Sequence, residues 1–203
     1  MLVSTADLLG DARRGKYAVG AFNVYNLEGA RAVIAAAEAE RSPVMLQLHP
    51  GALAHGSTPL VAGCLAAARE ATVPASVHLD HSTSPEEIGA ALDVGLRSVM
   101  ADGSHLGYAD NVAFVRQTAA RVHSQGGVVE AELGRLTGTE DGLTVPEYES
   151  RLTDPEQAGD FVRNTGVDAL AVCIGNVHGS YPGEPRLDFD RLSAIREATP
   201  VPL

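Results

Sequence analysis

Two kinds of segment alternate along the whole chain, and this alternation constrains the fold more than any other feature. Short apolar runs rich in β-branched residues are each followed by an alanine-rich amphipathic stretch. This order is typical of a parallel sheet, in which helices connect successive strands. We predict strands at Ala18–Asn23, Val44–Leu48, Ala75–Asp80, Ser98–Asp102, Val128–Leu133 and Ala169–Ile174, with Val201 beginning another. We predict helices at Leu27–Glu40, Pro59–Ala71, Pro85–Val94, Asp110–Ser124, Pro155–Asn164 and Phe189–Ala198.

Length and composition predict one soluble α/β domain over residues 1–203, because no low-complexity linker interrupts the rhythm. Two connections, 134–153 and 175–188, are long and rich in Gly, Pro and Thr, and we expect them to be mobile loops. No apolar run is long enough to span a bilayer, and the amino terminus lacks the pattern of a signal peptide. We therefore expect a cytoplasmic protein, with Cys64 and Cys173 as buried thiols.

The net charge of −11 argues against nucleic-acid binding, which needs a basic surface. It does not argue against a small phosphorylated ligand, which needs only backbone N–H groups and one or two basic side chains. Acidic groups are also what a divalent cation requires.

Acidic and histidine side chains stand at the carboxyl ends of the predicted strands. In a parallel barrel these ends form one face, where active sites are assembled from several strands. The residues at these ends are Asp80, His81, Asp102, Glu130, Glu132 and His178. Carboxylates that converge in a crowded interior resist burial unless a cation or hydrogen-bond donors compensate them, and a metal is the simpler explanation. We therefore expect a metal ion held by histidines and carboxylates, with Zn²⁺ preferred and Co²⁺ or Mn²⁺ possible. His78, deeper in its strand, is better explained as a structural residue.

Seven motifs resemble the class II fructose- and tagatose-bisphosphate aldolases in order and spacing, over nearly the whole chain. They are Gly20–Asn23, His78–His81, Asp102–His105, Glu130–Arg135, Gly138–Gly142, Leu152–Pro155 and Gly175–Gly179. Two stretches, His49–Leu53 and Ala171–Gly179, look most like the aldolase-like module of some plant multi-enzyme polypeptides.

The resemblance implies a fold and a set of roles. The fold is a (β/α)8 barrel of the TIM type, of which about the first six βα units are present in residues 1–203. His81 and His178 match zinc ligands, and Asp102 and Glu132 match acids that hold a second or displaced metal position. Asp80 matches the general acid/base, and Glu140 matches a mobile acid that transfers a proton. Gly179 matches part of a site for phosphate and a monovalent cation.

The implied activity is reversible aldol cleavage of a phosphorylated ketose to dihydroxyacetone phosphate and an aldehyde. A divalent cation stabilises the negative charge that develops beside the carbonyl, so no Schiff-base lysine is needed. The sole lysine, Lys16, precedes the first predicted strand, which argues against a lysine-based mechanism. The resemblance also implies a homo-oligomer.

Four individual roles stay open at this point. Asp80 could instead orient a ligand histidine, and Glu140 could be a solvated loop acid. Asn23 could orient substrate or cap the following turn. His49 stands where relatives carry a small hydroxyl residue that contacts substrate, so it is a candidate substrate-binding residue and leaves the substrate undefined.

Relatives continue beyond the position of Leu203 into a strand that carries a third zinc histidine and a phosphate nest. We therefore expect an exposed sheet edge. A fragment, a chain completed by another polypeptide, and a former aldolase with an assembly or regulatory role are all compatible with this end. A different metal-dependent lyase acting on sugar acids is a further alternative, supported only by His49.

Overall fold

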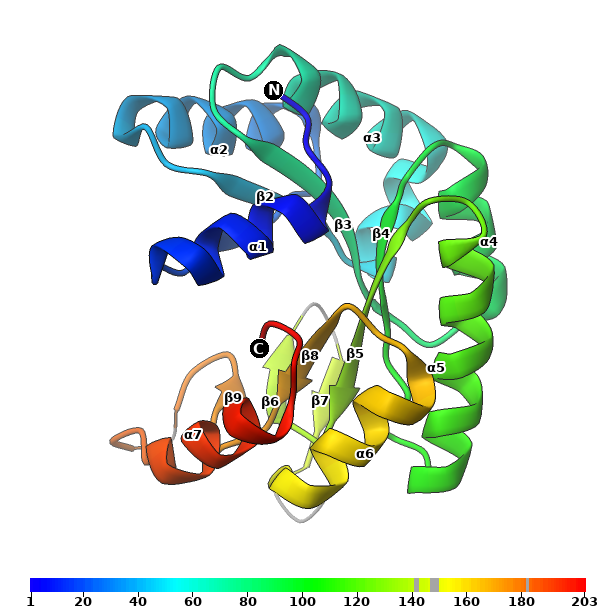
Figure 1. Ribbon diagram of the computed structural model, residues 1–203. Helices are drawn as coiled ribbons and strands as arrows, with labels where there is room; N and C mark the ends of the chain where they lie inside the picture. The colour runs from blue at the N-terminus through cyan, green and yellow to red at the C-terminus, as the bar shows by residue number, and fades with distance from the viewer. Residues whose placement is uncertain (141–142, 147–149, 182) are drawn as a thin grey trace. The chain divides into compact units, whose positions relative to one another are not determined.

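The computed structural model describes residues 1–140, 143–146, 150–181 and 183–203, and it divides the chain into two compact units. Unit 1 comprises Met1–Ala101 and Ala120–Val129, and unit 2 comprises Asp102–Ala119 and Glu130–Leu203. Six parallel strands follow one another in the order β1-β2-β3-β4-β5-β8. This βα order confirms the predicted α/β class, and it is the order expected for the first six units of a (β/α)8 barrel (Figure 1).

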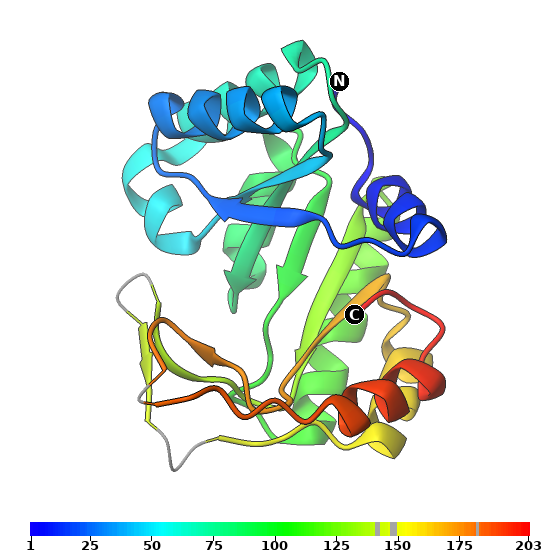
Figure 2. The same cartoon turned by 90° about the vertical axis from the view of Figure 1, so that its left-hand side faces the viewer.

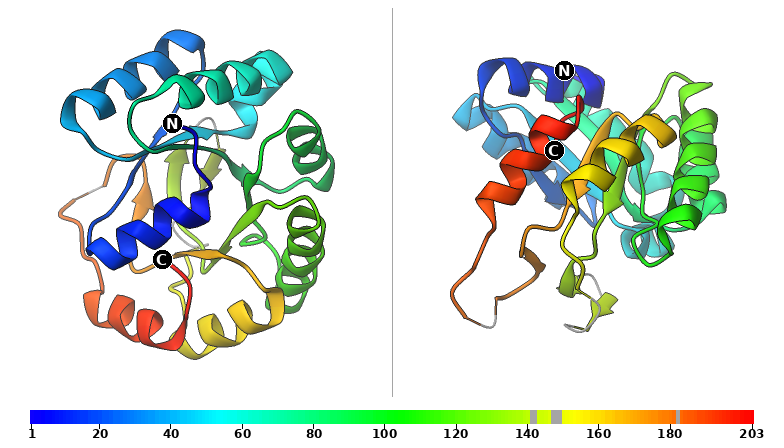
Figure 3. Two further views of the ribbon diagram at one scale, coloured as in Figure 1. Left: turned by 45° about the horizontal axis from the view of Figure 1, so that its top comes forward. Right: turned by 60° about the horizontal axis from the view of Figure 1, so that its bottom comes forward.

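Unit 1 contains the first four strands and the helices that connect them. Its elements are α1 (Thr5–Gly15), β1 (Gly20–Asn23), α2 (Leu27–Glu40), β2 (Val44–Leu48), α3 (Pro50–Glu70), β3 (Ala75–Ser82), α4 (Pro85–Asp93) and β4 (Ser98–Ala101). Helices α2 and α3 lie side by side (Figure 3). Residues on both faces of β3 are buried, as expected for a strand of a parallel sheet. β3 is therefore a buried strand that pairs with β2 and with β4.

Unit 2 contains most of α5 (Tyr108–His123) and of β5 (Val128–Leu133). It also holds β6 (Thr137–Glu140), β7 (Leu143–Val145), α6 (Pro155–Thr165), β8 (Ala169–Val172), β9 (Val177–His178) and α7 (Phe189–Ala198). β5 pairs in parallel with β8, from Glu130 beside Ala169 to Leu133 beside Val172. Helix α6 packs against α7, and Phe161 of α6 is fully buried.

Several helices begin at residues whose side chains cap the helix, and some of these caps can be predicted from the sequence. Ser84 and Asp154 cap α4 and α6, each followed by proline in the first turn, as predicted from the sequence. Helix α1 was not predicted, although Ser4 caps it, because only Thr5, Leu8 and Ala12 of it are buried. α3 begins at Pro50 rather than Pro59 because His49 caps it, and Ser57 kinks it with a φ of 47°.

The two long connections are not purely loops, which corrects the expectation for them. Strands β6 and β7 form an antiparallel hairpin, and β9 joins β6 in parallel, so that a three-stranded sheet links the two connections (Figure 2). Val201 does not begin a strand, although the N–H of Leu170 donates to the carbonyl of Pro202.

The expected exposed edge is present at β1, the first strand in the hydrogen-bonded order. Three of its four residues are exposed, and the Phe22 side chain is 51% exposed. Cys64 and Cys173 are buried and free, as predicted. Among the described residues, no helix has both the length and the apolar character needed to span a membrane.

Candidate metal and catalytic site

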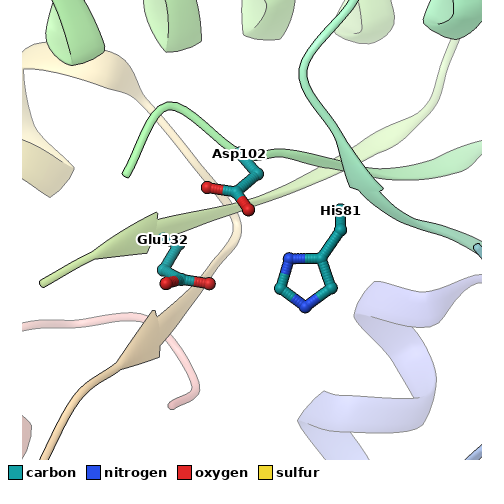
Figure 4. A group of neighbouring side chains, drawn as sticks. All are labelled: His81, Asp102 and Glu132. Carbon is teal, nitrogen blue, oxygen red and sulfur yellow. The ribbon is translucent and has the colours of Figure 1, made fainter. Parts of the chain in front are cut away.

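The carboxylates of Asp102 and Glu132 come together in unit 2. Asp102 directly follows β4, and Glu132 is the penultimate residue of β5. Their ligand oxygens lie within 4.8 Å of each other, and the two residues are 9% and 2% exposed. Figure 4 draws both side chains, together with that of His81. Two buried carboxylates this close repel each other unless a cation or hydrogen-bond donors compensate them, and a divalent metal ion is one cation that the pair could hold.

A local turn fixes the orientation of Asp102. Its Oδ1 accepts the N–H of Ser104 at 2.9 Å, and the N–H of Leu106 donates to the carbonyl of Gly103 at 2.9 Å. This hydrogen bond from a residue two positions onward is typical of aspartate at the start of a turn. It holds the carboxylate in place as the chain leaves β4.

His81 lies in unit 1, one residue before the end of β3, at an irregularity in the pairing with β4. Its φ is 43°, a left-handed backbone conformation that costs a residue with a side chain about 1–2 kcal/mol. Strain of this kind persists where the surrounding structure enforces it, and it is concentrated at functional sites. Imidazole, the donor group that His81 offers, is a common ligand of divalent transition metals.

His49 lies near His81 within unit 1. Their ring centroids are 6.2 Å apart, with the planes inclined at 56°. The Nδ1 atom of His49 accepts the N–H of Gly51 at 3.1 Å, and His49 is only 3% exposed. In the neutral ring the proton is therefore on Nε2. The side chain thus has a structural role as the cap of α3, and it is available for substrate binding only through its other nitrogen.

Asp80 and His78 are buried on β3, at 5% and 1% exposure. The Nδ1 of His78 lies 2.7 Å from the Oγ of Ser98. Burial, together with the nearby His81, lowers the pKa of His78 to about 3. A histidine that is neutral and hydrogen-bonded to a neighbouring strand fits the structural role expected for it.

The remaining predicted residues are placed as follows. His178 lies in β9 beside Gly138 of β6, and among the described residues it does not join the Asp102–Glu132 pair. Gly179 follows it with a φ of 75°. Asn23 ends β1. Glu140 ends β6, and its side chain lies outside the described part of the chain.

Sequence reasoning missed two residues that hold the end of β5, Asn111 and Thr153. The Nδ2 of Asn111 donates to the Glu132 carbonyl, and the Oγ1 of Thr153 donates to the Leu133 carbonyl. A signal for Asn111 was available, because it occupies the buried stripe of α5 that continues through Val115, Ala119 and Val122. A polar residue on such a stripe needs a hydrogen-bond partner.

The model of the class II fructose-bisphosphate aldolase family matches residues 3–203. The chain belongs to this family. Among solved structures, the YdjI aldolase of Escherichia coli K12 is 37% identical with a TM-score of 0.89, over 100% of this chain and 72% of that chain. A protein assigned as a fructose-1,6-bisphosphate aldolase from Coccidioides immitis is 41% identical with a TM-score of 0.89, over 96% of this chain and 69% of its own.

A third neighbour shares the fold alone. The fructose-bisphosphate aldolase of Campylobacter jejuni is 22% identical with a TM-score of 0.70, over 97% of this chain and 65% of that chain. Membership of the class II family supports a metal-dependent lyase that cleaves a carbon–carbon bond in a ketose-bisphosphate type of substrate.

Proposed function

We propose that this chain carries the metal site of a zinc-dependent aldolase that reversibly cleaves a phosphorylated ketose. The products would be dihydroxyacetone phosphate and an aldehyde, with fructose- or tagatose-1,6-bisphosphate as the substrate type. The observation that carries the proposal is the buried Asp102–Glu132 pair at the ends of β4 and β5, in a chain of the class II family. Zn²⁺ is the metal proposed, and Co²⁺ or Mn²⁺ would suit the same donor types.

The proposed ligands are His81 and His178, with Asp102 and Glu132 holding a second or displaced metal position. When bound, the metal supplies a Lewis acid that polarises the substrate carbonyl. The strained backbone of His81 and the turn at Asp102 support this assignment, because each fixes the direction of its side chain before the metal arrives. His178 would reach the metal from β9, whose position is set by pairing with β6.

Asp80 is the proposed proton carrier. In the direction of cleavage, one oxygen of its carboxylate takes the proton of the C4 hydroxyl. The C4 oxygen then becomes the aldehyde carbonyl as the C3–C4 bond breaks, and the electron pair of that bond stays on C3 as an enediolate with the C2 carbonyl. In synthesis, the protonated carboxyl group returns the proton to the aldehyde oxygen. Its 5% exposure supports this role, because a buried carboxyl exchanges its proton with substrate rather than with bulk water.

Three further residues complete the proposal. Glu140 transfers a proton at the carbon derived from the ketose, and Asn23 and His49 contact the substrate. The backbone at Gly179, in the left-handed region, provides N–H groups for a phosphate and a carbonyl for a monovalent cation. A homo-oligomer is proposed from family resemblance alone.

Metal binding and catalysis should be measured separately. Metal-free chain is titrated with Zn²⁺ by calorimetry, and release of dihydroxyacetone phosphate is followed with fructose- and tagatose-1,6-bisphosphate in parallel. We expect zinc affinity to fall at least tenfold in His178→Ala, which loses a ligand, and to fall also in Glu132→Gln, which loses a carboxylate of the second or displaced position. The control is His123→Ala, an exposed histidine at the end of α5, which should bind zinc like the wild type.

The two measurements separate the parts of the proposal. Asp80→Asn should bind zinc normally and lose turnover, because it removes the proton carrier without removing a ligand. Tight zinc without cleavage of any phosphorylated ketose would refute the aldolase reaction and leave the metal site. Absence of zinc binding by the wild-type chain would refute the metal site itself.

A further inference from the structure

Asn111 contacts the chain on both sides of the Asp102–Glu132 pair. It lies in the first turn of α5 and is 3% exposed. Its Nδ2 donates to the backbone carbonyl of Glu132 at 3.0 Å. This bond fixes the peptide unit of the residue that carries one of the two carboxylates. Asn111 is therefore connected directly to the end of β5.

The other end of the same amide group packs against Gly103, the residue after Asp102. A Cβ atom built on Gly103 would lie 2.2 Å from Oδ1 and 2.8 Å from Cγ of Asn111. The Gly103 backbone and the Asn111 amide thus lie closer together than any side chain at position 103 would allow. Among the described residues, Oδ1 has no hydrogen-bond partner, so packing against Gly103 and the donation from Nδ2 hold the amide in place.

The amide therefore lies between two chain segments, each of which carries an acidic residue, and contacts both of them. The separation of the two carboxylates, within 4.8 Å, is set by the positions of these segments. Since metal–ligand distances tolerate errors of only about 0.2 Å, the position of the amide bears on metal affinity.

We propose that Asn111 is a positioning residue for the metal site, setting the distance between Asp102 and Glu132 through its contacts with Gly103 and the Glu132 carbonyl. The inference rests on the proposed function, because it assumes that this pair takes part in binding a metal. In this proposal Asn111 contacts neither the metal nor the substrate. Its effect should therefore appear in metal affinity even without any substrate.

The first test compares Asn111→Leu with Thr118→Val by titration of the metal-free chains with Zn²⁺. Leucine keeps the number and connectivity of the side-chain heavy atoms of asparagine but cannot donate to Glu132. Thr118 is a matched control because it is also buried in α5, at 7% exposure, and has no contact with the pair among those described. We expect zinc affinity to fall about 10–100-fold in Asn111→Leu and to stay within about twofold in Thr118→Val. Circular dichroism of the metal-free chains verifies the fold.

The second test uses the close approach at Gly103. Gly103→Ala should also weaken zinc binding, because its methyl group displaces the amide of Asn111. Combined with Asn111→Ala, which removes that amide, it should weaken binding no further than Asn111→Ala alone. Independent effects that multiply in the double variant would overturn the proposed positioning role. If Asn111→Leu fails to fold, this cycle tests the same contact.

The outcomes distinguish this inference from the proposed function. A wild-type chain that binds no zinc refutes the metal site and the inference together. A wild-type chain that binds zinc, with unchanged affinity in a folded Asn111→Leu, refutes the inference alone. A fall in affinity restricted to Asn111→Leu and Gly103→Ala supports it.

Discussion

Replacing Gly138 by alanine should move His178 without unfolding the chain. Gly138 of β6 pairs with His178 of β9 and has a φ of 108°. A Cβ atom at this position would lie 2.0 Å from the carbonyl oxygen of His178 and 3.0 Å from its amide nitrogen. Non-bonded carbon atoms normally stay about 3.5 Å from their neighbours, so the β9 backbone must retreat by roughly 1–1.5 Å.

The displaced atoms belong to the backbone, so a change of rotamer cannot relieve the contact. β6 and β9 are paired over only two residue pairs, and separating them is therefore easier than unfolding unit 2. A shift of about 1 Å exceeds the tolerance of about 0.2 Å for a metal–ligand distance. If His178 is a ligand, zinc affinity should fall at least tenfold, approaching that of His178→Ala.

The assay is calorimetric zinc titration, with the urea midpoint measured on the same metal-free samples. Gly166→Ala is the control, because Gly166 also has a positive φ, 72°, but nothing lies within 4 Å of an added Cβ. It should lose about 1 kcal/mol of stability and keep its zinc affinity. Normal zinc binding in Gly138→Ala, together with loss in His178→Ala, would refute the reasoning that the β6–β9 contact positions the histidine.

Three further predictions concern unit 1 and the thiols. His81→Gly should leave the metal-free chain about 1 kcal/mol more stable towards urea than His81→Ala, because alanine retains the strain at a φ of 43°; equal midpoints would contradict this. Burial lowers the pKa of His78 from 6.5 to about 3, so the unfolded chain binds a proton that the folded chain excludes. The free energy of unfolding is therefore highest above pH 6.5 and falls by about 1.4 kcal/mol per pH unit as the pH drops below 6.5. His78→Gln should flatten this part of the curve of unfolding free energy against pH. Burial raises the pKa of the Cys64 thiol to about 11 and also raises that of Cys173, so both should react slowly with a thiol reagent at pH 8 until the chain unfolds; rapid labelling of the native chain would be inconsistent with their burial.

The sequence predicted the strands well because its apolar runs are short and sharply bounded. Val44–Leu48 and Val128–Leu133 were predicted residue for residue, and β3 differs only by extending to Ser82. The small sheet of β6, β7 and β9 was not predicted, since its strands are only two to four residues long. Such strands carry almost no periodic signal and form because their partners are already nearby.

The candidate site divides in a similar way. The sequence identified Asp102 and Glu132 as candidate ligands, because an acid at the carboxyl end of an apolar strand needs a chemical reason. It could not show that Asn111 contacts both segments. Asn111 and Glu132 are separated by twenty-one positions in the chain, and the other contact depends on the absence of a side chain at Gly103. His49 was predicted to bind substrate, and the structure adds that one of its nitrogens already caps α3.

By itself the sequence determined the βα order, the class II family motifs and the kinds of donor group available to a metal. These are properties of local patterning, in which burial and residue type repeat with the period of each element. Only the tertiary structure decided the strained backbone at His81, the pairing of His178 with Gly138 and the spacing of the carboxylates by Asn111. Those features depend on contacts between segments that are distant in the chain. The distances at these contacts matter to a fraction of an ångström, and local sequence patterns do not predict them.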